Sequence, residues 1–182
     1  SPLKICRVCC FLCFLFIFPF YQYIDENTIL GVGFADEETE NGEWIDGIKI
    51  VLFDISDSSN PKVLDSVVFK NTHSQAQYDP KAFMVNNDKG YYAVPYSEYI
   101  NWSEIDYEED YHEDFDENYQ TVSGAKTFNI ENNKISVTND FLMNEGNAEA
   151  NRCTYIGDYI YLIGTDYDEN YEDIIKVKGY KY

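Results

Sequence analysis

The chain has 182 residues, 45% of them hydrophobic, which is enough for one domain with a substantial core. Aromatic residues make up 17% of the chain, a share that favours strands over helices. The formal net charge of -20 argues against a nucleic-acid partner, because phosphates need Lys and Arg to displace their counterions. It is compatible with cations, with basic partners, or with solubility alone.

Residues 1–20 differ from the rest of the chain. Lys4 and Arg7 precede an apolar run at 8–18, which is too short to cross a bilayer as an untilted helix and resembles the core of a signal peptide. No small-residue cleavage site precedes Tyr21, so a signal or anchor and a leader foreign to the fold both stay open. Membrane contact is expected only through this segment. Its four cysteines lack a second ligand pair at finger-like distance, so zinc is not expected.

Three similar units follow from Tyr21. Each opens with an apolar hairpin, predicted at 20–24 with 29–34, at 82–85 with 91–96, and at 153–156 with 159–164. A polar loop then leads to a third strand that opens alike in each unit, at Gly47-Ile48-Lys49, Gly124-Ala125-Lys126 and Ile174-Ile175-Lys176. The first two units continue into a fourth strand, at 62–69 and 134–143, and the third unit stops after its third strand.

This repeat predicts the fold. Four strands per period with loops of variable length are typical of radially repeated sheets, and the unit starts give periods of about 61 and 71 residues. We therefore predict an all-β partial β-propeller of about two and two-thirds four-stranded antiparallel blades over 21–182, with 1–20 as a leader. Closed propellers typically have 4 to 8 blades. We therefore expect a C-terminal piece of a longer propeller, whose missing blades complete the ring, and the alternative is a ring completed by partners.

Several segments resemble a known family. They are Tyr23 to Phe34, Gly47 to Asp57, Tyr78 to Phe83 and Arg152 to Tyr161, and they are similar in order and spacing to bacterial and archaeal secreted proteins with a C-terminal β-propeller domain. Pro80 stands where that family has His. The resemblance implies a propeller distantly related to WD40 repeats, located extracellularly or on the cell surface, without established catalytic residues to carry over.

The negative charge is concentrated in three loops. Segments 36–46, 104–117 and 166–173 carry six, nine and five acidic residues, with no Lys or Arg in any of them. All three join the second strand of a unit to its third. In a propeller such loops leave on one face, so the negative field is expected to be concentrated there.

Two of these loops repeat a tetrad of Asp or Asn, an aromatic residue and two polar residues. Solvated insertions, Ca²⁺ sites, and a surface for a basic protein or a carbohydrate are the open interpretations. The candidate Ca²⁺ ligands are Asp106, Asp110, Asp114, Asp116, Asp166 and Asp168. No loop matches an EF-hand, because Tyr171 stands where that motif requires Gly.

The residues for catalysis are not evident in the sequence. His73 and His112 lie in no nucleophile or metal motif, and Arg152 is expected to anchor a carboxylate such as Asp158 or to cap a blade. We therefore expect a non-catalytic extracellular or cell-surface binding module with an acidic loop face. The alternative is a fragment of a propeller hydrolase that acts on carbohydrate through a pair of carboxylates.

Overall fold

The computed structural model of the chain describes residues 20–38, 44–57, 59–101, 119–143 and 147–182. These residues form antiparallel sheets joined by turns and two short 3-10 helices, so the all-β prediction is confirmed. Within these ranges the structure contains no helix of the length and hydrophobicity that crossing a membrane requires. The predicted leader at 1–20 lies outside the described residues except for Phe20, which begins the first strand.

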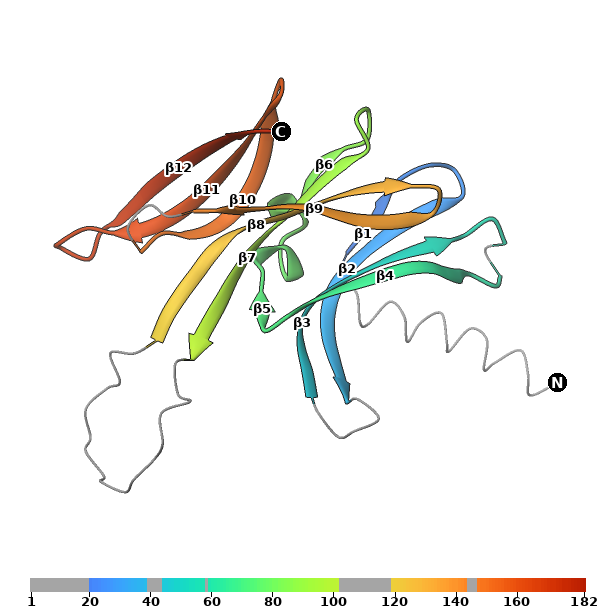
Figure 1. Ribbon diagram of the computed structural model, residues 1–182, viewed down its shortest axis with the longest axis horizontal. Coiled ribbons are helices and arrows are strands. Elements are labelled where there is room, and N and C mark those ends of the chain that lie inside the picture. The colour runs from blue at the N-terminus through green and yellow to red at the C-terminus, as the bar shows by residue number, and fades with distance from the viewer. Residues whose placement is uncertain (1–19, 39–43, 58, 102–118, 144–146) are drawn as a thin grey trace.

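The first sheet has the strand order β1-β2-β3-β4 (Figure 1). Its strands are β1 (Phe20–Tyr23), β2 (Thr28–Glu38), β3 (Trp44–Asp54) and β4 (Lys62–Lys70). The turn between β1 and β2 forms because the Asp25 carboxylate accepts the backbone N–H of Asn27 at 2.8 Å, which offers the chain a local alternative to continuing the strand.

Two short strands form the inner edge of the second sheet. β7 (Tyr91–Asn101), β8 (Tyr119–Glu131) and β9 (Lys134–Leu142) follow the predicted order, while both β6 (Met84–Asn86) and β5 (Thr72–His73) pair with β7. Between β5 and β6 lie the 3-10 helices η1 (Gln75–Gln77) and η2 (Pro80–Ala82). The sequence predicted no strand between 69 and 82, and this was wrong, since β5 pairs with β7 and extends the sheet.

The third sheet has three strands, β10 (Glu149–Ile156), β11 (Tyr159–Tyr167) and β12 (Asp173–Lys181). The inner hairpin strands β7 and β11 therefore belong to separate sheets, as the repeat predicted. β12 has β11 on one side and no fourth strand on the other among the residues the structure describes. The strand predicted at 153–156 begins earlier, because the segment 149–152 also belongs to β10.

The strand registers give the neighbours of the three lysines that the repeat singled out. Lys49 lies opposite Gly33, Lys126 opposite Val94 and Lys176 opposite Gly164. Two residues earlier stand Gly47, Gly124 and Ile174, as the sequence predicted. A Cβ atom on either glycine would lie 2.1 Å from the carbonyl oxygen of Phe69 or Phe141, because the fourth strand crosses closely over the third at that point.

The core lies between neighbouring sheets. One cluster joins the first and second sheets, and its large members include Leu30, Ile50, Tyr92 and Phe128, each no more than 2% exposed. A second cluster joins the second and third sheets. Its members include Tyr91, Ala125, Cys153, Ile160 and Leu162. The middle sheet is therefore covered on both faces, as expected for successive blades.

Candidate functional site

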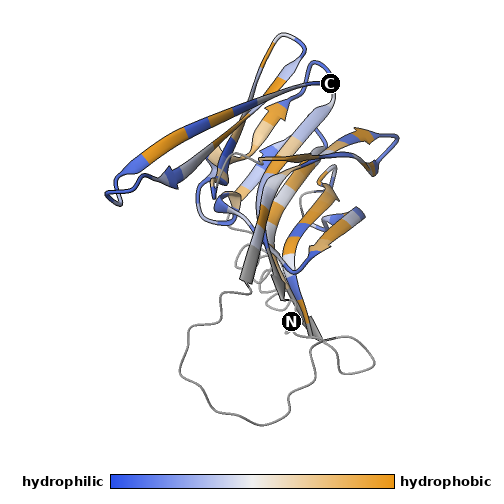
Figure 2. Cartoon of the chain, turned by 60° about the vertical axis from the view of Figure 1, so that its left-hand side comes forward, coloured by the Kyte–Doolittle hydropathy of each residue, from blue (hydrophilic) through white to orange (hydrophobic). Residues whose placement is uncertain are grey.

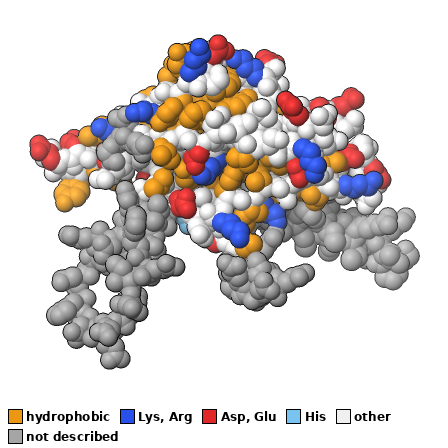
Figure 3. Space-filling model, viewed as in Figure 1, with side chains coloured by type: hydrophobic (Ala, Val, Ile, Leu, Met, Phe, Trp, Pro, Cys, Tyr) orange, Lys and Arg blue, Asp and Glu red, His pale blue; other side chains and the backbone are white. Residues whose placement is uncertain are grey.

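Two of the six predicted Ca²⁺ ligands lie in the described part of the chain, and both stand at the turn between β11 and β12. The Asp168 carboxylate accepts the backbone N–H groups of Glu172 at 2.9 Å and Asn170 at 2.8 Å, and these bonds lower its pKa. Asp166 accepts the N–H of Tyr167 at 2.8 Å. Figure 3 shows acidic side chains at the far left, where this turn lies.

The other four predicted ligands, Asp106, Asp110, Asp114 and Asp116, lie outside the described residues. Over the described ranges, no three His, Cys, Asp or Glu side chains are grouped as a metal site would need. The structure therefore places Asp166 near the end of β11 and Asp168 in the turn that follows, and the six-residue ligand set stays a prediction.

Tyr171, which stands where an EF-hand requires Gly, has a left-handed backbone conformation. Its φ is +63°, in the left-handed region, and its side chain is 88% exposed. The other non-glycine residues with positive φ in the described segments are Asn71, Asn132 and Asn133, and Asn tolerates this region well. The turn therefore contains backbone strain that its own hydrogen bonds to Asp168 maintain.

A hollow of about 480 Å³ lies beside the β1–β2 turn of the first sheet. It is lined by Asp25, Glu26, Asn27, Thr28, Asp54, Ser56, Leu64 and Asn133. The Asp54 carboxylate accepts hydrogen bonds from Ser56, which lower its pKa. The sequence placed Leu64 in the predicted strand 62–69 and Asp25 to Thr28 in the turn of the first hairpin, and it did not bring these residues together. Their convergence follows from the pairing of Thr28 with Asp54 and from the β8–β9 turn of the next sheet, which no local pattern encodes.

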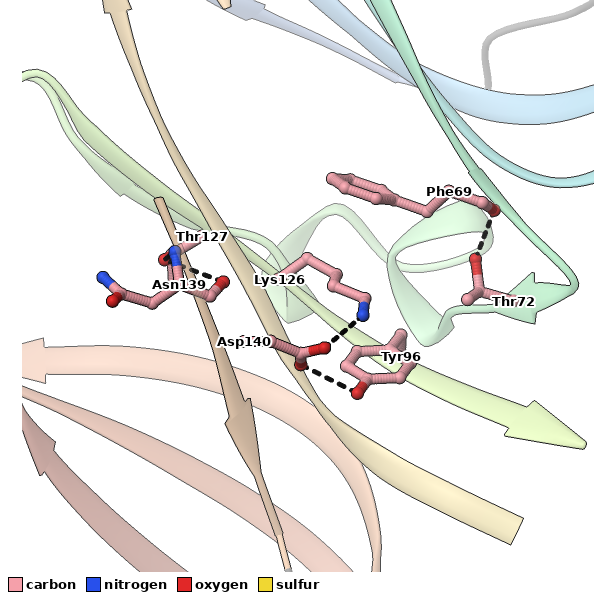
Figure 4. A network of polar contacts seen from close by, with 7 residues as sticks. All are labelled: Phe69, Thr72, Tyr96, Lys126, Thr127, Asn139 and Asp140. Carbon is pink, nitrogen blue, oxygen red and sulfur yellow. Dashed lines mark hydrogen bonds and ion pairs between the residues drawn. The ribbon is translucent and has the colours of Figure 1, made fainter. Parts of the chain in front are cut away.

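A polar network lies where the second sheet meets the first (Figure 4). The Tyr96 hydroxyl donates to Asp140 at 2.8 Å, and the Lys126 ammonium pairs with the same carboxylate while lying 4.3 Å from the centre of the Tyr96 ring. Burial and the bond to Asp140 raise the pKa of Tyr96, whose side chain is 1% exposed. Every group in the network has a partner, so it fixes β9 on β8 instead of offering a reactive group.

Arg152 pairs with a different carboxylate from the one the sequence suggested. Its guanidinium donates to Asp79 at 2.7 Å, which joins β10 to the segment before η2. Asp158 instead pairs with Lys89 at 2.6 Å. The prediction that Arg152 anchors a carboxylate is confirmed, but the expected partner, Asp158, was wrong. Asp79 is distant in sequence and reaches Arg152 only through the insertion between β5 and β6.

One of the two histidines of the chain lies in the described residues. His73 lies on β5 with its Nε2 atom 3.8 Å from a carboxylate oxygen of Asp46, and both side chains are about half exposed. His112 lies outside the described residues. The side chains of His73 and Asp46 are both exposed, so this is a contact on the surface of the protein and not part of a buried site.

The comparisons with known proteins agree with this architecture. The family described as "Beta propeller domain" matches residues 19–171. An uncharacterized protein of Archaeoglobus fulgidus is 28% identical over 151 residues, which make up 81% of this chain and 18% of that protein, so the chain spans about a fifth of that relative's length. No solved structure matches the chain significantly. Because the family match covers most of the chain and the structure divides into the successive antiparallel sheets that the repeat predicted, the chain belongs to the β-propeller domain family.

Proposed function

We propose that this part of a β-propeller is a non-catalytic binding module whose ligands meet the acidic loop face. One observation carries the proposal. β2, β7 and β11 each precede the third strand of their unit, so the segments that follow them start from equivalent strand ends (Figure 1). This equivalence supports a common acidic face for the 20 acidic residues of segments 36–46, 104–117 and 166–173.

The ligand class we propose for this face is a hard cation, namely Ca²⁺. Ca²⁺ takes 6 to 8 oxygen ligands, and carboxylates from two neighbouring loops supply them without a preformed cage. Asp106, Asp110, Asp114 and Asp116 come from the β7–β8 loop, and Asp166 and Asp168 come from the β11–β12 turn. Clustered carboxylates repel one another, so a bound cation relieves that repulsion and links binding to stability.

Calorimetric titration with Ca²⁺ at fixed ionic strength tests this proposal. We expect binding at about 10⁻⁴ to 10⁻³ M, the range of extracellular modules, because ordering a loop offsets part of the gain. Changing Asp106, Asp110, Asp114 and Asp116 to Asn should abolish the heat and the Ca²⁺-dependent rise in melting temperature. Fixed ionic strength is needed because monovalent salt also screens the repulsion.

A matched control removes the same charge from the opposite end of the sheets. The control variant carries Asp25→Asn and Glu26→Gln in the β1–β2 turn, Asp88→Asn in the β6–β7 turn and Glu131→Gln at the end of β8. This variant should bind Ca²⁺ as the parent protein does. Equal loss of heat in both variants would mean that only net charge matters, and the cation proposal would then be abandoned.

We propose in addition that the module acts outside the cell or on its surface, with a basic protein or a carbohydrate as the larger ligand and with further blades as a partner. The support is the resemblance to secreted propeller proteins, the apolar run at 8–18, and the uncovered face of the third sheet. Cell fractionation of the natural host tests the location. Recovery of the protein only with cytoplasmic markers would refute it.

A further inference from the structure

The link between β5 and β6 lies where the three sheets meet (Figure 1). Its helix η1 contacts β2 of the first sheet, β7 of the second and β10 of the third. The link bonds to Gly47, which directly follows the acidic segment 36–46, and to Arg152, which lies opposite Ile163 shortly before the acidic segment 166–173. It therefore lies at the end of the sheets from which these acidic segments start.

The link is fixed in place although it contains only short elements. Hydrophobic residues are concentrated in the strands and hydrophilic residues at the hairpin turns (Figure 2), but this link contributes Ala76 and Ala82 to the core, both of them fully buried. The Gln77 amide donates to the carbonyl oxygens of Gly33 at 3.4 Å and Gly47 at 3.3 Å. The backbone before and after residue 78 is therefore held against the sheets.

Tyr78 stands exposed between these fixed points. Its side chain is 74% exposed, and its ring meets that of Phe34 edge-on, with the ring centres 5.6 Å apart and the planes at 71°. A Tyr side chain has only two χ angles, so a ring on a fixed backbone loses little entropy when a ligand packs on it. Tyr78 is therefore placed to contact a ligand.

Hydrogen-bonding groups of both charges follow Tyr78. The Asp79 carboxylate accepts the backbone N–H of Lys81 at 3.0 Å and the Arg152 guanidinium at 2.7 Å. The side chains of Arg152 and Asp79 stay 45% and 28% exposed, and Lys81 is exposed as well. A guanidinium has five N–H donors and a carboxylate about four acceptor sites, so both groups can bond to a ligand while paired with each other.

We propose that Tyr78, Asp79, Lys81 and Arg152 form a binding subsite for a neutral carbohydrate. The Tyr78 ring packs on an apolar C–H face of a sugar, while Arg152 donates to its hydroxyl groups and Asp79 accepts from them. A neutral ligand fits better than a charged one, because the acidic segments repel anions and the two basic side chains repel cations. This rests on the carbohydrate proposed above as the larger ligand, and it does not need bound Ca²⁺.

Affinity electrophoresis of the full-length chain tests the subsite. Native gels contain dextran, pullulan or galactomannan as neutral probes, or polygalacturonate as an acidic one. We expect at least one neutral polysaccharide to retard the chain and polygalacturonate not to. Tyr78→Ala should raise the Kd obtained from the retardation at least about tenfold, and Tyr78→Phe, which keeps the ring, should stay within about twofold of the parent chain. Tyr23→Ala is the matched control, because the Tyr23 ring is 67% exposed but lies at the end of β1.

The outcomes separate this subsite from the function proposed above. Equal weakening by Tyr78→Ala and Tyr23→Ala would overturn the subsite and leave the carbohydrate ligand standing, whereas no retardation by any neutral polysaccharide would overturn both. Stronger retardation by polygalacturonate would also overturn the subsite. Lys81→Ala, which keeps the backbone bond to Asp79, should weaken binding about threefold and provides a second variant if circular dichroism shows Tyr78→Ala to be unfolded. Changing Asp106, Asp110, Asp114 and Asp116 to Asn should leave the retardation unaltered, so the Ca²⁺ proposal is tested separately.

Discussion

Replacing Gly124 with Ala tests the close crossing of the fourth strand over the third. Gly124 does not have a positive φ, so the added methyl group acts through contact alone. The new Cβ atom would lie 2.1 Å from the carbonyl oxygen of Phe141, more than 1 Å short of the ordinary contact distance of 3.4 Å. That oxygen belongs to the backbone and cannot rotate away, so β9 has to shift. Overpacking at about 1–3 kcal/mol and the loss of about two ladder hydrogen bonds together give about 3–5 kcal/mol of lost stability.

Urea unfolding followed by circular dichroism measures this loss. With a slope of about 2 kcal/mol per M, the midpoint of Gly124→Ala should fall by about 1.5–2.5 M. Gly157→Ala is the matched control, because a Cβ atom there meets nothing within 4 Å and only the φ of +61° is strained. Its expected cost is about 1 kcal/mol. Equal midpoints for the two variants would show that the crossing is looser than described and would remove the reason given for Gly at this position.

Three further changes test other parts of the structure. Gln77→Ala should lower stability by about 2 kcal/mol in urea unfolding, because the buried amide donates to the carbonyl oxygens of Gly33 and Gly47; an unchanged midpoint would contradict this. Tyr171→Asn should raise the melting temperature slightly by relieving a φ of +63°, and a lower value would point to an unrecognised contact of the ring. Asp65→Asn should destabilise the protein by about 1 kcal/mol at neutral pH. The N–H of Ile135 and the Lys134 ammonium lower the pKa of Asp65, so this difference should disappear as the pH falls below about 4 through the lowered pKa, and a difference that persists in acid would exclude this cause.

The sheets were predictable because their signals are local. The alternation of apolar residues in 47–54 and 159–164 and the turn residues between strands are sufficient to place strands and hairpins. The repeat also predicted a third strand that contains Lys49, Lys126 or Lys176 in each unit, and all three lysines lie on such strands. Periodicity carries this information because each blade repeats one pattern of burial.

The contacts between units were not predictable in the same way. β5 is two residues long, too short for a periodic pattern, and the pairing of Arg152 with Asp79 depends on a 3-10 insertion that brings distant segments together. The hollow lined by Asp25 and Asp54 likewise forms only when β2 pairs with β3. The proposed Ca²⁺ ligands stay a prediction, since four of the six lie outside the described residues.

Because the middle sheet is covered on both faces, it should be the last part of the chain to unfold. In a linear array each sheet is stabilised by its neighbours, so the sheet with two of them has the most to lose on opening. Gln77 of the second sheet also links it to the first, because its side-chain amide donates hydrogen bonds to Gly33 of β2 and Gly47 of β3. Backbone amides of β7 and β8 should therefore exchange with deuterium last, those of β12 first, and those of β2 and β3 together with the second sheet as one cooperative unit.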